Sequence, residues 1–148
     1  MVNLSAPDLT QHPPRSVRVR LGGYAHLCRL LDKARAEIAG KNGDYHYNCP
    51  LDQRFFAFTG INPEAMLAEI KTGKTDVQML EWVNTTSKRP VHEVIAWSAW
   101  LENLGPGGAE GHEWIGGMIK GHKSARDDIR AFADLLDLDD YLSYGGKA

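Results

Sequence analysis

Side chains that could carry out chemistry are concentrated in residues 42–54 of the 148-residue chain. They supply a thiol, an imidazole, phenols, an amide and charged groups: Tyr45, His46, Tyr47, Asn48, Cys49, Asp52 and Arg54. Polar and aromatic groups on a loop that Pro50 fixes at one end are typical of a ligand pocket. A buried, hydrogen-bonded loop that joins two helices would have the same composition, and the residues favour neither interpretation over the other.

A catalytic version of this loop would use Cys49 as the nucleophile and His46 as the base, since a thiolate needs a proton acceptor or a positive charge nearby. The same two residues have a spacing compatible with metal ligation. No second close pair of ligands accompanies them, so we expect no metal. The sequence identifies no catalytic residue, cofactor or reaction class, and it leaves open whether the protein is an enzyme.

A second group of functional side chains is the arginine-rich segment 15–20. Strand-like alternation would put Arg18 and Arg20 on one side, spaced to bind a carboxylate or phosphate. If this segment meets the loop, the ligand-binding residues would be Arg15, Arg18, Arg20, Tyr45, His46, Cys49, Asp52 and Arg54. The competing interpretation, which we favour, pairs the arginines of the segment with the acidic residues near 137–140.

Three further patterns carry weaker indications of function. Residues 112–116 begin like a zinc-protease helix, but Gly116 stands where the second histidine is required. The glycine-rich stretch 105–111 lacks the Lys-Ser/Thr pair of a phosphate-binding loop. Tryptophans at helical spacing are more typical of core packing. An alternative function is nevertheless a homodimeric interaction module anchored by the N-terminal arm or by Trp82, Trp97 and Trp100.

Composition places the chain among ordinary globular proteins. It is 43% hydrophobic and 24% charged, with a net charge of −2, so we expect one domain and no general affinity for nucleic acid or an anionic membrane surface. Its two cysteines fit a reducing compartment. Neither a secretory leader nor a membrane span is evident in the sequence, which favours a cytoplasmic location.

The periodicity of apolar residues predicts the elements that must position these side chains. Residues 1–16 contain three prolines and should form an extended arm, followed by a single helical domain over 17–148. Val17–Leu21 alternates like a strand with one buried face. From Tyr24 the period becomes helical. Its apolar face holds Leu27, Leu30, Leu31, Ala34 and Ile38, and the polar residues largely opposite are Arg29, Asp32, Lys33, Arg35 and Glu37.

Capping residues and glycines divide the rest of the chain into short helices. Five further helices should start at residues suited to helix N-termini: Pro50, Asn62, Thr75 or Asp76, Pro90 and Ser124. A glycine-rich helix over 109–122 would lie between the last two. The sequence therefore predicts a mainly α, single-domain bundle of six or seven short helices, to which a small strand pair could be added.

Several motifs resemble those of an uncharacterised family of small bacterial proteins, catalogued as a domain of unknown function. They are Asp8-Leu9-Thr10, Pro13 to Ser16, Arg18 to Tyr24, Leu31 to Ala36, Gly43 to Tyr47, Cys49 to Phe55 and Leu135 to Tyr141. The resemblance covers nearly the whole chain and implies a bacterial, one-domain protein, but it supplies no activity. The best expectation from sequence is therefore a small cytoplasmic protein with a pocket for a small anionic molecule.

Overall fold

Seven helices make up the fold, and the computed structural model describes residues 6–146. They are α1 (Leu27–Ile38), α2 (Pro50–Thr59), α3 (Pro63–Lys71), α4 (Asp76–Ser87), α5 (Val91–Asn103), α6 (Ala109–Gly121) and α7 (Phe132–Ser143). The predicted mainly α, single-domain bundle of six or seven helices is thus confirmed.

The strand predicted for Val17–Leu21 is wrong. Within residues 6–146 the only β pairing is an isolated bridge between Leu21 and Tyr24. Gly22 and Gly23 both adopt positive φ, of 57° and 85°, and turn the chain so tightly that Leu21 and Tyr24 bond to each other. Glycine adopts positive φ without the steric cost that a Cβ brings, so this pair folds the segment back before a second strand can form.

The predicted helix starts are confirmed wherever a capping side chain or proline marks them, except at Ser124. Asn62 caps α3 by accepting a hydrogen bond from the Ala65 amide at 2.9 Å. Thr75 forms a reciprocal capping box with Gln78 at the start of α4. Pro50 occupies the first turn of α2, and Gly60 ends that helix at a φ of 72°. These local signals can be read without knowledge of the tertiary fold.

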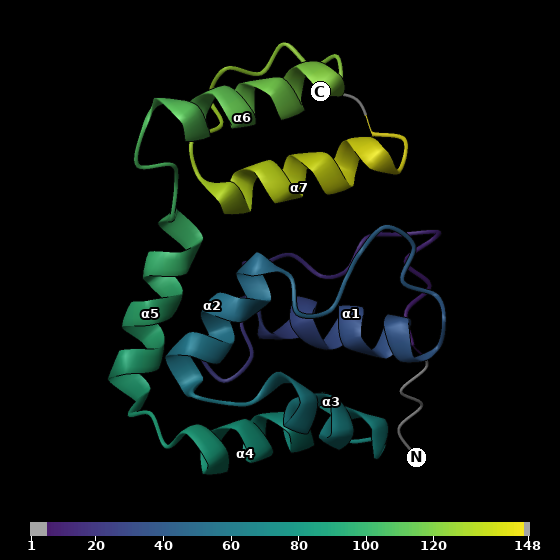
Figure 1. The fold of residues 1–148 in the computed structure, drawn as a ribbon, viewed down its shortest axis with the longest axis vertical. Coiled ribbons are helices and arrows are strands. Elements are labelled where there is room, and N and C mark those ends of the chain that lie inside the picture. Colours follow the sequence, from purple (N-terminus) through teal and green to yellow (C-terminus); the bar gives the residue numbers. More distant parts are fainter. Residues whose placement is uncertain (1–5, 147–148) are drawn as a thin grey trace.

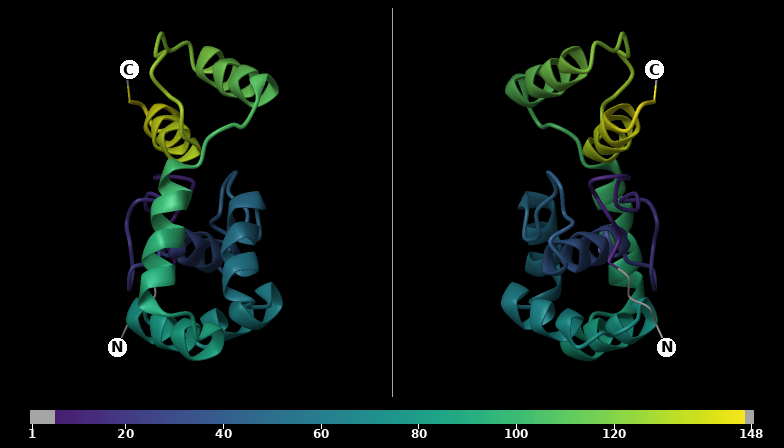
Figure 2. Two further views of the ribbon diagram at one scale, coloured as in Figure 1. Left: turned by 90° about the vertical axis from the view of Figure 1, so that its left-hand side faces the viewer. Right: turned by 90° about the vertical axis from the view of Figure 1, so that its right-hand side faces the viewer.

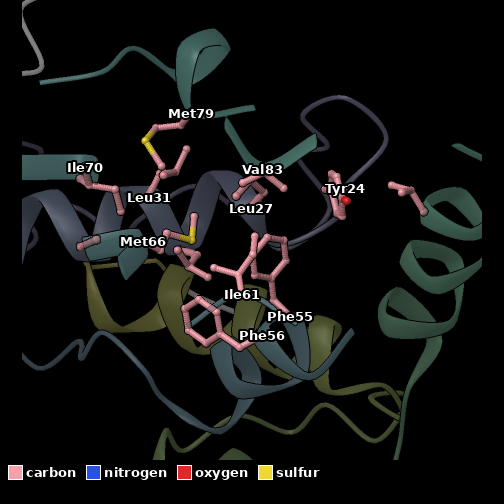
Figure 3. Packing of buried hydrophobic residues seen from close by; sticks show 13 residues of the cluster. Tyr24, Leu27, Leu31, Phe55, Phe56, Ile61, Met66, Ile70, Met79 and Val83 are labelled. Carbon is pink, nitrogen blue, oxygen red and sulfur yellow. The ribbon is translucent and has the colours of Figure 1, made fainter. Parts of the chain in front are cut away.

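Helix α1 lies at the centre of the larger part of the molecule (Figure 1). Helices α2, α3 and α4 surround it, and α5 runs along one side towards a smaller unit made of α6 and α7 (Figures 1 and 2). The main core joins α1 to α2, α3 and α4 through residues that include Leu27, Leu31, Phe55, Met66 and Met79 (Figure 3). Burial of this apolar surface is the dominant favourable contribution to folding.

The sequence pattern places the charged residues of α1 on a solvent-facing side, but most of them are buried. Four of the five residues predicted on the polar face are buried: Arg29, Asp32, Lys33 and Arg35. Glu37 is exposed as expected, whereas Ile38, assigned to the apolar face, is also exposed. The physical reason is that segments distant in sequence bring opposite charges to each buried group, and periodicity cannot detect such partners.

Helices α6 and α7, with the segment between them, form a separate hydrophobic cluster of Ile115, Ile119, Ile129, Leu135 and Leu138. The helix predicted to start at Ser124 begins at Phe132 instead. Ser124 Oγ accepts a hydrogen bond from the Arg126 amide at 3.2 Å, so it closes a local turn rather than capping a helix.

The N-terminal arm is anchored to the segment after α1 and to the end of α7. The Leu9 amide donates to the Lys41 carbonyl at 2.8 Å, and the Tyr144 hydroxyl donates to the Leu9 carbonyl at 2.6 Å. The first five residues of the predicted arm, and residues 147–148 of the predicted domain, lie outside the described part of the chain. Across that described part, every helix is too short or too polar to cross a bilayer.

Candidate functional site

A buried carboxylate at the start of α2 organises the candidate site. Asp52 is fully buried and lies in the first turn of α2. Its Oδ1 pairs with His26 Nε2 at 2.6 Å, and both of its oxygens accept hydrogen bonds from Lys33 Nζ at 2.9 Å. The amide of Asn48 donates to Oδ2 at 2.9 Å. Asp52 therefore joins the start of α1, the middle of α1 and the preceding loop.

Lys33 connects this carboxylate to the half-buried thiol of Cys49. Only 4% of the Lys33 side chain is exposed. Besides Asp52, its Nζ contacts the carbonyl oxygen of His46 at 3.1 Å and Sγ of Cys49 at 3.0 Å. A buried ammonium is stable only when it is paired and hydrogen-bonded, and these four acceptors satisfy that requirement. Its charge is consequently fixed beside the sulfur.

Cys49 has a backbone position that suits a reactive side chain. It is the N-cap of α2, with φ −69° and ψ 170°, and Pro50 follows as the first helical residue. The positive end of the helix dipole lies at such a position. The other thiol, Cys28, is buried in α1, where desolvation raises its pKa above the ordinary value of 9.0. Cys28 is thus enclosed in the core, whereas Cys49 is half buried and lies beside an ammonium.

His26 is held in an unusual conformation. It precedes α1 in the left-handed region, with φ 71°, which is uncommon for residues other than glycine. Desolvation lowers its pKa below 6.5 despite the opposing effect of Asp52. The ring is therefore neutral, and because Asp52 is ionised, Nε2 carries the proton and donates it. Nδ1 is left as a buried lone pair without a hydrogen-bond partner among residues 6–146.

The pKa of Asp52 is lowered as well. Burial acts to raise it, but the hydrogen bond from His26 and the charge of Lys33 outweigh burial and hold it below 3.8. The cluster therefore contains one negative carboxylate, one positive ammonium and one neutral imidazole. Such a group is electrically balanced, which explains how it is accommodated in the interior.

The other buried charged residues of α1 pair with other segments. Arg29 contacts Asp140 of α7 at 2.7 Å, Asp32 contacts Arg15 of the arm at 2.9 Å, and Arg35 contacts Asp76 of α4 at 2.6 Å. Helix α1 thus binds the arm, α2, α4 and α7 through one ionic contact each. This arrangement positions Lys33 rigidly, since each neighbouring turn of its helix is anchored.

The structure brings together only some of the residues predicted for a ligand site. Cys49 and Asp52 meet at Lys33, and His46 contributes its backbone carbonyl while its side chain is exposed. Tyr45 lies apart from them because its hydroxyl donates to Asp140 at 2.7 Å. Its pKa is raised well above 10.0, first by desolvation and then by Asp140.

The predicted arginines are engaged elsewhere. Arg15 pairs with Asp32 and Asp76, Arg18 with Asp134 and Asp137, and Arg20 with Glu102. Arg54 lies over the ring of Trp100, 5.8 Å from its centroid. Acidic residues near 137–140 thus contribute partners, as Asp137 does for Arg18, but most partners come from other segments.

Sequence reasoning missed His26 and Lys33 as site residues. Lys33 was assigned to the polar face of a helix, and His26 precedes that helix without any motif. The available signal was the helical spacing of Lys33 and Arg29, since two cations one turn apart would require nearby acids if buried. No group of three or more potential metal ligands occurs among the described residues.

Two surface hollows lie away from this cluster. One, of about 450 Å³, is bordered by Arg126, Asp134, Asp137 and Tyr141 near α7. The other, of about 650 Å³, is bordered by Lys74, Gln78 and Trp82. The residues bordering both hollows are largely polar and include none of the Lys33 cluster, in which the Cys49 side chain is half buried.

Comparison with known proteins adds a family but no activity. A family model described as a domain of unknown function matches residues 11–142, which include the arm arginines, the Lys33 cluster and most of α7. No curated protein matches the chain. Any function must therefore be inferred from the geometry of the chain itself.

Proposed function

Because the chain belongs to the DUF5069 family, a domain of unknown function, we propose its function from the geometry alone: it reacts with small electrophilic molecules through the thiol of Cys49. From the sequence-based expectation we retain a small-molecule site. We assign the thiol, rather than the arginines, as the group that engages the molecule, because those arginines pair with carboxylates or stack on Trp100.

The observation that carries this proposal is the 3.0 Å distance between Lys33 Nζ and Cys49 Sγ. A cysteine reacts as its thiolate, and a fixed positive charge or a helix N-terminus favours that form. Cys49 has both, and it is only half buried, so a small molecule can approach. Asp52 keeps the ammonium in place by binding it through two oxygens.

The test is alkylation with iodoacetamide, read by mass spectrometry of the intact chain and of its peptides. Under native conditions we expect one label, on Cys49, and in urea a second, on Cys28. Cys28 is the internal control, because its thiol is buried and its pKa is raised. A native chain that takes up no label, or that is labelled equally on both cysteines, would contradict the proposal.

A second candidate function is a homodimeric interaction module, supported by the exposed apolar residues of α5. Val91, Ile95 and Trp100 expose 68%, 48% and 46% of their surfaces. Trp82 and Trp97, expected to contribute, pack against the core instead. Light scattering of the wild type and of Trp100→Ala tests this function. A dimer that weakens in the variant supports it, and a monomer at every accessible concentration excludes it.

A further inference from the structure

Lys33 and Cys49 are close enough to become covalently linked. We propose that, once Cys49 is oxidised to a sulfenic acid by hydrogen peroxide, Lys33 Nζ captures the sulfur and forms a sulfenamide between α1 and the start of α2. The inference rests on the proposed function, since it needs a reactive Cys49 thiol. The 3.0 Å separation of the two atoms means that only a small movement is required.

The chemistry balances in two steps. The Cys49 thiolate attacks one oxygen of hydrogen peroxide, the O–O bond breaks, and hydroxide leaves and is protonated to water, which gives the sulfenic acid. Lys33 then loses a proton to Asp52, whose two oxygens lie 2.9 Å from Nζ. The amine lone pair attacks sulfur, the S–O bond breaks, and hydroxide leaves with that proton as water. The second proton on nitrogen is released to solvent.

The local backbone favours Lys33 over the usual alternative. A sulfenic acid can condense with a nearby backbone amide nitrogen. The residue after Cys49 is Pro50, which carries no N–H. Lys33 Nζ is a nitrogen already in contact with the sulfur, so it is the group placed to intercept the sulfenic acid.

The link would change the cluster chemically and not only mechanically. A sulfenamide nitrogen carries no positive charge, so Asp52 would keep hydrogen bonds from His26 and Asn48 but lose its ammonium partner. It would also tie α1 to the N-terminus of α2. A thiol reductant attacks the sulfur and restores both side chains, so the link is reversible.

The experiment is intact-mass and peptide analysis after treatment with hydrogen peroxide. A direct S–N link makes the chain lighter by about 2 Da and joins the peptides of Lys33 and Cys49. A disulfide between Cys28 and Cys49 would have the same mass, so the measurement is made on Cys28→Ser. We expect the loss of mass to persist in Cys28→Ser, to vanish in Cys49→Ser, and to be reversed by dithiothreitol.

Other changes in the mass of the chain after peroxide treatment would contradict the sulfenamide link. Gain of two or three oxygens, about 32 or 48 Da, without joined peptides would show that Lys33 does not capture the sulfenic acid. An oxygen-bridged product, heavier by about 14 Da, would exclude the direct bond. If iodoacetamide labels Cys49 while peroxide gives only these products, the proposal of a reactive Cys49 thiol is supported and the proposal of a sulfenamide is refuted. Absence of both reactions refutes the proposed function as well.

Discussion

The His26 ring donates its Nε2 proton to Asp52 Oδ1 over 2.6 Å, and both side chains are completely buried. This bond orients the carboxylate so that both of its oxygens can bind Lys33. Lys33 then lies against the Cys49 sulfur. A buried histidine at the start of α1 thus fixes, through two intermediates, the charge beside a thiol at the start of α2.

Removal of the Asp52 carboxylate should be strongly destabilising. Asp52→Ala leaves Lys33 buried without its counter-ion, and breaking a buried pair in this way costs about 3 to 5 kcal/mol of unfolding free energy. Urea unfolding followed by circular dichroism measures it. Asp44→Ala is the matched control, because Asp44 is exposed, and it should change stability by less than about 0.5 kcal/mol. Equal effects of the two substitutions would contradict the assigned role.

Acid should destabilise the protein in two stages. The folded-state pKa of His26 is lowered below 6.5 by desolvation, so the unfolded chain takes up that proton first and stability falls as the pH drops below 6.5. The folded-state pKa values of Asp52 and Asp76 lie below 3.8, because their partners outweigh burial. Their contributions are present above pH 3.8 and are lost as the pH falls through their folded-state values.

His26→Asn separates these stages. Asparagine tolerates the left-handed backbone at this position and does not titrate. Urea unfolding at a series of pH values should show that the variant loses the decline that begins near pH 6.5 and keeps the decline below 3.8. If the upper stage persists unchanged in His26→Asn, another group causes it.

The arm should depend on Arg15 for its attachment. Arg15 Nε and one terminal nitrogen bind the two oxygens of Asp32, at 3.0 and 2.9 Å. A double-mutant cycle with Arg15→Gln and Asp32→Asn should give a coupling of about 1 to 3 kcal/mol, as expected for partly buried, charged hydrogen bonds. The exposed pair Arg18 and Asp134 should give less than about 1 kcal/mol. Indistinguishable couplings would argue against a special role for Arg15.

Glycine at position 43 should be required for docking of the arm. Gly43 has φ 54°, and a Cβ there would lie 2.8 Å from the Leu9 carbonyl oxygen. Gly40 also has positive φ, but a Cβ there would meet nothing within 4 Å. Gly40→Ala should therefore cost about 1 kcal/mol from backbone strain alone, and Gly43→Ala measurably more. Thermal unfolding compares them, and equal costs would contradict the close approach.

Local signals explain what could be predicted from the sequence. Asn62, Thr75 and Pro50 act within one helical turn, so the starts of α3, α4 and α2 could be read directly. Ser124 presented the same signal, yet it closes a turn. A cap residue predicts that some backbone amide will be satisfied, but only tertiary packing decides whether a helix follows.

The candidate site was less predictable because its contacts are long-range. Residues 42–54 could be singled out by composition, and Cys49 and Asp52 do lie in the cluster. The buried cation came from α1, where Lys33 looked like a solvent-facing residue. Its burial depends on Asp52, nineteen positions later, and on the loop between them. Periodicity describes one helix at a time, so it cannot show that a charged face is covered by opposite charges.

The most direct test of whether Lys33 activates Cys49 is the rate at which iodoacetamide alkylates Cys49 at neutral pH. Lys33→Met combined with Asp52→Asn removes both charges of the pair and leaves no unpaired buried ion. His46→Ala removes the base expected from the sequence. We predict that the Lys33→Met/Asp52→Asn chain, shown to be folded by circular dichroism, reacts at least about tenfold more slowly at neutral pH. His46→Ala should react like the wild type. A slow His46→Ala and an unchanged Lys33→Met/Asp52→Asn chain would contradict the claim that Lys33 activates Cys49.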